Sequence, residues 1–205
     1  NSATRNFDTS TPKTKLSQRL KLGAMLRFRL PKCHHTSAMI ALIQRVSTAS
    51  VSIADEPVGT IGRGLLALIG VQPTDDEQST VRLLERLLAY RVFPDDLGRM
   101  NRSLQDIQGG LLLVPQFTLA ADTRKGNRPS FGTAAAPEVA KRLFEQLCAS
   151  AQQRHPVVAT GRFGADMQVA LVNDGPVTFW LQVAPQAVSS ADVASAKPSS
   201  PLATA

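Results

Sequence analysis

The side chains that could do chemistry lie in two short stretches, and neither contains a standard catalytic set. Gln116 and Thr118 follow a buried apolar run and offer an amide and a hydroxyl. Residues 173–179 place the hydroxyl of Thr178 beside Gly175-Pro176. A hydroxyl can act as a nucleophile, but no base that would activate Thr178 is recognisable in the sequence. Catalysis would therefore depend on positioning, on backbone donors or on a group that the substrate brings.

The histidines and cysteines do not supply a catalytic set either. His155 is the only histidine between residues 39 and 184, and its polar surroundings predict an exposed loop position. Cys33 and Cys148 make neither a disulfide framework nor a metal cluster, and Cys148 on the apolar side of a helix is expected to be a core thiol. His34 and His35 lie beside Cys33 without a fourth ligand. The sequence therefore predicts no metal and no cofactor.

Residues 173–179 also contain a strong turn signal. Asn173-Asp174-Gly175-Pro176 separates two apolar runs, Met167 to Val172 and Val177 to Val183, which are both typical of strands. Glycine and proline together can hold main-chain atoms rigidly at the tip of two strands. An ordinary hairpin turn is the alternative interpretation of the same residues.

The rest of the chain predicts one α/β domain that could position these stretches. About nine short strands and two main helices are expected, in a mixed or antiparallel, barrel-like layered sheet. The first helix is expected from Thr74-Asp75-Asp76-Glu77 to Tyr90, with Val81 on its apolar face, and the second begins at Pro137. The principal strands are predicted at 39–46, 49–53, 65–71, 110–114 and 157–159, with a bend at 59–64. A dinucleotide-binding fold is not expected, because the sequence has no regular βαβ alternation and no phosphate-binding glycine motif.

Charge and composition divide the chain into three parts. Residues 1–38 carry eight Lys or Arg against one Asp and so hold the whole formal excess of +7. This basic extension is expected to be disordered, and it could be a targeting segment, an RNA-binding arm or sequence upstream of a true start at Met39. Residues 39–184 form the neutral predicted domain, and 185–205 a disordered tail rich in Ala, Ser and Pro. No run approaches the roughly 18 apolar residues of a membrane span, so a cytoplasmic protein without a membrane partner is expected.

Both stretches resemble motifs of the D-aminoacyl-tRNA deacylases, the D-tyrosyl-tRNA(Tyr) deacylase family. The family motif Ser-Gln-Phe-Thr-Leu is matched by Gln116-Phe117-Thr118-Leu119, and Asn-X-Gly-Pro-Val-Thr-Phe by residues 173–179 in full. The resemblance extends from Met39 to Val183 and therefore covers nearly all of the foldable chain. Where the family usually has serine this chain has Pro115, which offers neither a hydroxyl nor an N–H.

The resemblance implies a homodimeric hydrolase of the ester that joins a D-amino acid to tRNA. It also implies a cis bond at Gly175-Pro176, which reaches into the partner's site and rejects L-amino acids, with Asn173 and Val177 beside it. Steric exclusion cannot reject glycine, so glycyl-tRNA, including glycine mischarged on tRNA(Ala), is an expected substrate. Catalysis is expected to be RNA-assisted, with the ribose 2′-hydroxyl activating water and the N–H groups of Phe117 and Thr118 steadying the carbonyl.

The resemblance gives roles to three further side chains. Phe163 and Met167 resemble the residues that form the pocket for the terminal adenine in the family. Packing in the core is the alternative role for both. Arg45 is similar to an arginine that braces the Gly-Pro loop, with a surface arginine at a strand end as the alternative.

Two other functions remain open from the sequence. A non-catalytic tRNA-binding module of the same fold would also lack catalytic side chains. A sister deacylase that edits L-amino acids would share the fold, and Phe117 in the first motif favours the D-specific branch.

Overall fold

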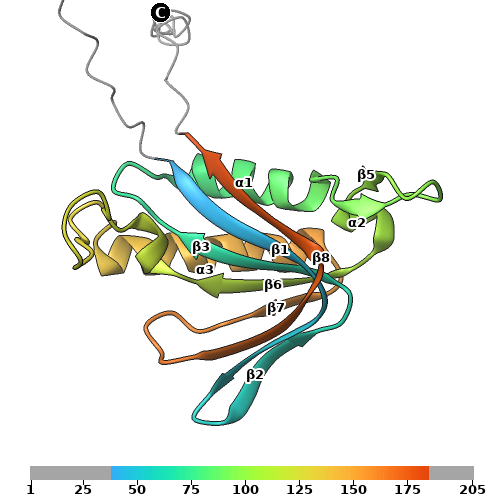
Figure 1. The fold of residues 1–205 in the computed structure, drawn as a ribbon. Helices are drawn as coiled ribbons and strands as arrows, with labels where there is room; N and C mark the ends of the chain where they lie inside the picture. The colour runs from blue at the N-terminus through green and yellow to red at the C-terminus, as the bar shows by residue number, and fades with distance from the viewer. Residues whose placement is uncertain (1–37, 185–205) are drawn as a thin grey trace, which may run out of the picture. The chain divides into compact units, whose positions relative to one another are not determined.

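The computed structural model describes residues 38–184, which form strands and helices without a regular alternation (Figure 1). The elements, in order, are β1 (Met39–Ile53), β2 (Glu56–Ile61), β3 (Gly64–Gly70), α1 (Glu77–Ala89), β4 (Phe93–Pro94), β5 (Met100–Arg102), α2 (Leu104–Ile107), β6 (Gly110–Pro115), the 3-10 turn η1 (Phe117–Ala120), α3 (Pro137–Arg154), β7 (Val158–Thr160) and β8 (Gln168–Val183). The extension 1–38, apart from Ala38, and the tail 185–205 lie outside the described residues.

The long strand β1 organises the main sheet. One edge of β1 pairs with β3 along its first half and with β2 along its second half, and β8 pairs with both halves from the other edge. All three pairings are antiparallel, whereas β3, β6 and β7 run parallel to one another. The sheet curls round so that β2 and β7 approach each other below the main layer (Figure 1). The predicted mixed, barrel-like α/β fold with two main helices is therefore confirmed.

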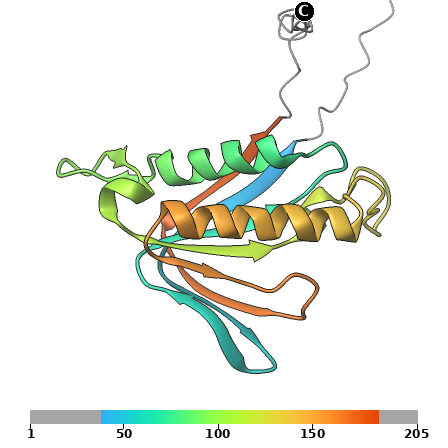
Figure 2. The same cartoon turned by 180° about the vertical axis from the view of Figure 1, so that it is seen from behind.

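Strand alternation divides the core into two clusters. Along β3, Leu65, Ala67 and Ile69 face the helices, whereas Leu66 and Leu68 face the inside of the curl. Helices α1 and α3 cover one face of the sheet, as Figure 2 shows from behind. Because both faces of β3 and β6 are buried, these two strands are almost wholly apolar.

The long helices begin where the sequence predicts. Asp76 caps α1 by accepting from the Ser79 N–H at 2.7 Å, and Pro137 opens α3. Val81 was expected on the buried face of α1, but its side chain is 39% exposed, because the buried stripe runs through Leu83, Leu84, Leu87 and Leu88 instead.

The strand predictions were wrong where the sheet bends. The segments 39–46 and 49–53 form the single strand β1, and the segments predicted at 167–172 and 177–183 belong, except for Met167, to the single strand β8. The two strands bend together, with register shifts on either side of Val46, so a break in the apolar pattern is not a break in the strand. The expected bend at 59–64 is largely strand as well, since β2 continues to Ile61.

His155 is the clearest error among the predicted side-chain positions. It is 4% exposed rather than on an open loop, because it ends α3 and packs its ring between elements. Its Nε2 lies 2.6 Å from the carbonyl oxygen of Gly109. Cys148 packs against the core as predicted, and burial raises the pKa of its thiol to about 12. Both residues are structural in this arrangement.

Candidate functional site

A pocket of roughly 310 Å³ opens where β6 ends. After Pro115 the chain turns into η1, and the Gln116 N–H donates to the Ile69 carbonyl at 2.7 Å, which fixes the turn to β3. The next two amides, of Phe117 and Thr118, find no acceptor within residues 38–184, because they form the open first turn of a 3-10 helix. The turn therefore carries two adjacent N–H donors that remain available to a ligand.

The walls of this pocket bring together four of the predicted site residues. Gln116 and Phe117 lie on one side, and Phe163 and Met167 lie on the other, in the loop between β7 and β8. Both loop residues are half-buried, so each packs partly on the core while it lines the pocket. A Cβ on Gly161 would lie only 2.9 Å from the Met167 sulfur, so glycine lets the loop close onto the pocket.

The second predicted stretch is a bulge inside β8 rather than a turn between strands. Gln44 pairs with Thr178 and Val46 with Asn173, so residues 174–177 lie opposite the single residue Arg45. The Gly175-Pro176 peptide is cis, and Gly175 has a φ of 133°, where other residues are strained.

Arg45 holds this bulge from the neighbouring strand. Its side chain is 11% exposed, and its Nε lies 3.0 Å from both the carbonyl and a carboxylate oxygen of Asp174. Its Nη1 donates to the Val92 carbonyl at 2.6 Å. The arginine thus ties the bulge to the segment that leads into β4, and it is not a surface residue at a strand end, because β1 continues through it.

The polar groups of the bulge satisfy one another. The side-chain oxygen of Asn173 accepts from the Val177 N–H at 2.8 Å, and its amide donates to the Thr178 hydroxyl at 2.9 Å. Gln44 donates weakly to the same hydroxyl at 3.5 Å. Both partners of Thr178 are amides rather than bases, so nothing in this hydrogen-bond set activates the hydroxyl for attack.

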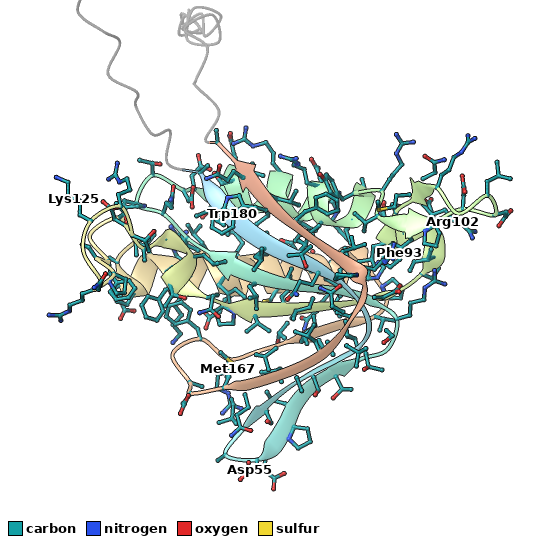
Figure 3. All side chains as sticks on the ribbon, in the orientation of Figure 1. Asp55, Phe93, Arg102, Lys125, Met167 and Trp180 are labelled. Carbon is teal, nitrogen blue, oxygen red and sulfur yellow. The ribbon has the colours of Figure 1, made fainter. Side chains whose placement is uncertain are left out.

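The pocket and the bulge lie at opposite ends of the sheet. Met167 precedes β8 and Asn173 lies six residues further along, so about 20 Å of extended strand separates them. In Figure 3 Met167 lies on the left of the sheet, whereas Phe93, which follows the Arg45 partner Val92, lies on the right. One copy of the chain therefore does not bring the two motifs together.

The comparisons with known proteins agree on one family. The model of the family described as D-Tyr-tRNA(Tyr) deacylase matches residues 42–182. The D-aminoacyl-tRNA deacylase of Alkalilimnicola ehrlichii is 64% identical over 149 residues, which cover 73% of this chain and 99% of that protein. That of Ralstonia nicotianae is 58% identical over 164 residues, covering 78% and 99%.

This chain belongs to the D-Tyr-tRNA(Tyr) deacylase family. The family assignment made from the two motifs, and with it the prediction of an ester hydrolase, is confirmed.

Two solved structures have folds similar to that of this chain. A structure titled "c-Myc DNA Unwinding Element Binding Protein" is 36% identical with a TM-score of 0.66, covering 69% of this chain and 97% of that one. A structure of a probable eukaryotic D-amino acid tRNA deacylase has a TM-score of 0.63 at 17% identity, covering 71% and 100%, and shows the fold alone.

Residues 38–184 provide neither a cluster of metal ligands nor a membrane-spanning helix. That segment contains no group of three or more His, Cys, Asp or Glu placed to hold a metal ion. None of its helices is long and apolar enough to cross a membrane.

One residue beside the pocket received no role from the sequence. The ring of Phe131 lies 5.1 Å from that of Phe117, although the two residues are fourteen positions apart. The pairing depends on how the loop after η1 folds back, and no local pattern in the sequence indicates it.

Proposed function

We propose that this chain hydrolyses the ester of D-aminoacyl-tRNA and releases the D-amino acid and tRNA. The observation that carries the proposal is the pair of unsatisfied amides, of Phe117 in the wall of the pocket and of Thr118 directly after it, in a chain of this family. Amides fixed in a turn are suited to an oxyanion, because their dipoles need no reorganisation when charge develops.

The reaction is proposed to use few protein side chains. The N–H groups of Phe117 and Thr118 stabilise the carbonyl oxygen as water attacks, and the substrate's own ribose 2′-hydroxyl helps to activate that water. Pro115 has no N–H and the Gln116 N–H is already engaged, so these two are the donors that the turn can offer. Losing one such donor typically costs about 10²–10³ in rate.

Phe163 and Met167 are proposed to bind the terminal adenine. A phenyl ring and a polarisable thioether suit the face of a base, and both already line the pocket opposite Gln116 and Phe117. This arrangement would present the ester linkage to the turn.

Gly175 and Pro176 are proposed to reject L-amino acids in the pocket of a second copy. The bulge presents main-chain atoms, and Arg45 together with Asn173 and Val177 fixes its position, so it could act as a rigid wall where an L side chain would project. Glycine has no side chain to exclude, so glycyl-tRNA, including glycine on tRNA(Ala), would also be hydrolysed.

The proposed second copy has a surface available on β8. Within residues 38–184 this strand pairs with β1 alone, and it keeps large apolar side chains exposed, including Trp180 at 48%. A homodimer that buries this surface could place the bulge of each copy at the pocket of the other. The roughly 20 Å of strand between Met167 in the pocket and Asn173 at the bulge is what makes a partner necessary in this proposal.

Single-turnover deacylation of D-Tyr-tRNA, L-Tyr-tRNA and Gly-tRNA tests the function. Rapid loss of the D-tyrosyl and glycyl esters with the L-tyrosyl ester spared is the expected result. Comparable release of L-tyrosine would indicate the L-editing sister activity. No turnover of any substrate by folded protein that still binds tRNA would indicate a non-catalytic module.

A further inference from the structure

A cationic loop lies next to the pocket and faces solvent. Between Thr123 and Phe131 it carries Arg124, Lys125 and Arg128 and no acidic residue. Arg124 is occupied, because its Nε and Nη2 donate to the two carboxylate oxygens of Asp122 at 2.8 and 2.6 Å.

Lys125 and Arg128 differ from Arg124 because, within residues 38–184, they have no carboxylate partner. Both are exposed, and neither makes an ion pair with any residue of the described segment 38–184. Their charges are therefore available to an anion.

Two exposed aromatic rings connect this loop to the pocket. Phe117 is 55% exposed and lines the pocket, and Phe131 is 42% exposed and contacts Phe117 with ring planes tilted by 53°. Large exposed aromatics cost hydration free energy, and a stacking ligand would recover it. Phe131 is thus one ring beyond the pocket wall, on the side of the cations.

The loop is held where Phe131 leaves it. Asp122 and Ser130 exchange two backbone hydrogen bonds, of 2.7 and 3.0 Å, which close the loop directly before Phe131. The Ala135 N–H donates to the Val71 carbonyl at 3.1 Å on the other side. These hydrogen bonds fix the backbone on both sides of Phe131, so its ring has a defined position.

We propose that Phe131, Lys125 and Arg128 bind the unpaired nucleotide that precedes the terminal adenosine of the tRNA. This inference rests on the proposed function, which places the terminal nucleoside in the pocket. The base stacks on Phe131, and Lys125 and Arg128 contact the phosphates on either side of that nucleotide. Aromatic platforms flanked by unpaired cations are the general means of binding single-stranded nucleic acid.

The geometry favours a single strand over a helix. Phe117 lines the pocket and its ring contacts that of Phe131, so a nucleotide that leaves the pocket past Phe117 would meet Phe131 next. A paired base could not offer its face to a side chain, so the nucleotide at Phe131 has to be unpaired.

Binding of uncharged RNA tests the platform without any turnover. A hairpin RNA with the unpaired tRNA 3′ end carries fluorescent 2-aminopurine immediately before the terminal adenosine and is titrated with the full chain. We expect quenching by wild type and by Phe131→Tyr. Phe131→Ala should lose the quenching and about tenfold in affinity. Quenching that is unchanged in Phe131→Ala would overturn the proposal.

The cations are tested in the same titration. Lys125→Ala and Arg128→Ala should each reduce the slope of log affinity against log salt by about one. Arg102→Ala is the matched control, because Arg102 is an exposed cation on the opposite side of the molecule from Lys125 (Figure 3), and its slope should stay at the wild-type value. Equal slopes for all three variants would contradict phosphate contacts by this loop.

A turnover assay distinguishes two roles of Phe131, stacking with the nucleotide and positioning of the Phe117 ring. Phe131→Ala should lower kcat/KM about tenfold on D-aminoacyl-tRNA, mainly through KM, but leave hydrolysis of D-aminoacyl-adenosine within twofold, since that substrate lacks the preceding nucleotide. An equal fall on both would show that Phe131 only positions Phe117 and would overturn the proposal. Absence of wild-type turnover would count against the deacylase activity, while the RNA titration would still decide the platform.

Discussion

The pocket at the end of β6 and the bulge in β8 use their polar groups in opposite ways. At the pocket, two amides and most of the Phe117 ring are left open. At the bulge, Arg45 and Asn173 satisfy the main chain from inside the protein. Open groups favour ligand binding, whereas internally satisfied groups hold a shape. The pocket is therefore suited to recognising a substrate, and the bulge to standing rigidly against one.

The same contrast appears in the glycine of each region. A Cβ on Gly175 would meet Val177 Cγ2 at 2.6 Å and the Val177 backbone nitrogen at 2.9 Å, at a φ of 133°. A Cβ on Gly161 would meet the end of the flexible Met167 side chain, at a φ that other residues tolerate. One site resists change through its backbone, and the other can adapt.

Gly175→Ala should have the largest effect of the variants considered. Backbone strain and the contact with Val177 should lower the free energy of unfolding by about 3 kcal/mol, and the displaced bulge should admit L-Tyr-tRNA. Gly161→Ala is the matched control, expected to cost about 1 kcal/mol because Met167 can move. Urea unfolding and L-substrate turnover measure both. Equal costs at the two glycines would remove the contrast between the regions.

Arg45→Ala should destabilise the protein by about 2 kcal/mol, because it leaves the Asp174 and Val92 carbonyls without their charged donor. Asp174→Ala removes only the half-exposed carboxylate and should cost less than about 1 kcal/mol. Chemical denaturation of the two variants and their double mutant gives the comparison. A larger loss from Asp174→Ala than from Arg45→Ala would show that the ion pair, not the carbonyl contacts, holds the bulge.

Phe117→Ala should act on binding rather than on stability. Its ring is largely exposed, so unfolding should change by less than about 0.5 kcal/mol, while kcat/KM on D-Tyr-tRNA falls about tenfold with the loss of one stacking surface. Leu84 is fully buried, so Leu84→Ala should behave in the opposite way and lower the free energy of unfolding strongly. A large loss of stability in Phe117→Ala would mean that the ring belongs to the core.

Thr178→Ala should have the smallest effect. The hydroxyl only completes the hydrogen bonds of Asn173 and Gln44, so single-turnover rates on D-Tyr-tRNA should stay within about threefold of wild type. Near-total loss of turnover in a folded variant would establish Thr178 as a participant in the reaction.

The sequence predicted the layered fold well because the fold follows from strand and helix periodicity. Leu65 to Ile69 and Leu111 to Leu113 are apolar on both faces, and Asp76 and Pro137 mark helix starts by local chemistry. The same local logic failed at Asn173–Pro176. Turn residues also suit a bulge, and only pairing with β1 on both sides keeps the strand continuous.

Side-chain positions that depend on distant neighbours could not be predicted. His155 is buried by a contact with Gly109, forty-six residues away, and Phe131 meets Phe117 only because the loop between them is closed by Asp122 and Ser130. The two motifs were identifiable from sequence. The distance between the pocket and the bulge was not, because it requires knowing that β8 is one strand.

Mixing two variants tests most directly whether the pocket of one copy works with the bulge of another. Gly175→Ala should cleave both D- and L-Tyr-tRNA, and Phe117→Glu should cleave neither, because a carboxylate at the pocket wall would repel the negative charge that develops on the ester carbonyl. When the two are co-refolded with Phe117→Glu in excess, each intact pocket acquires a wild-type bulge from its partner. The account predicts that L-Tyr-tRNA cleavage disappears while D-Tyr-tRNA cleavage per intact pocket remains. Persistent L-Tyr-tRNA cleavage at every ratio would contradict it, because each pocket would then be working with the bulge of its own chain.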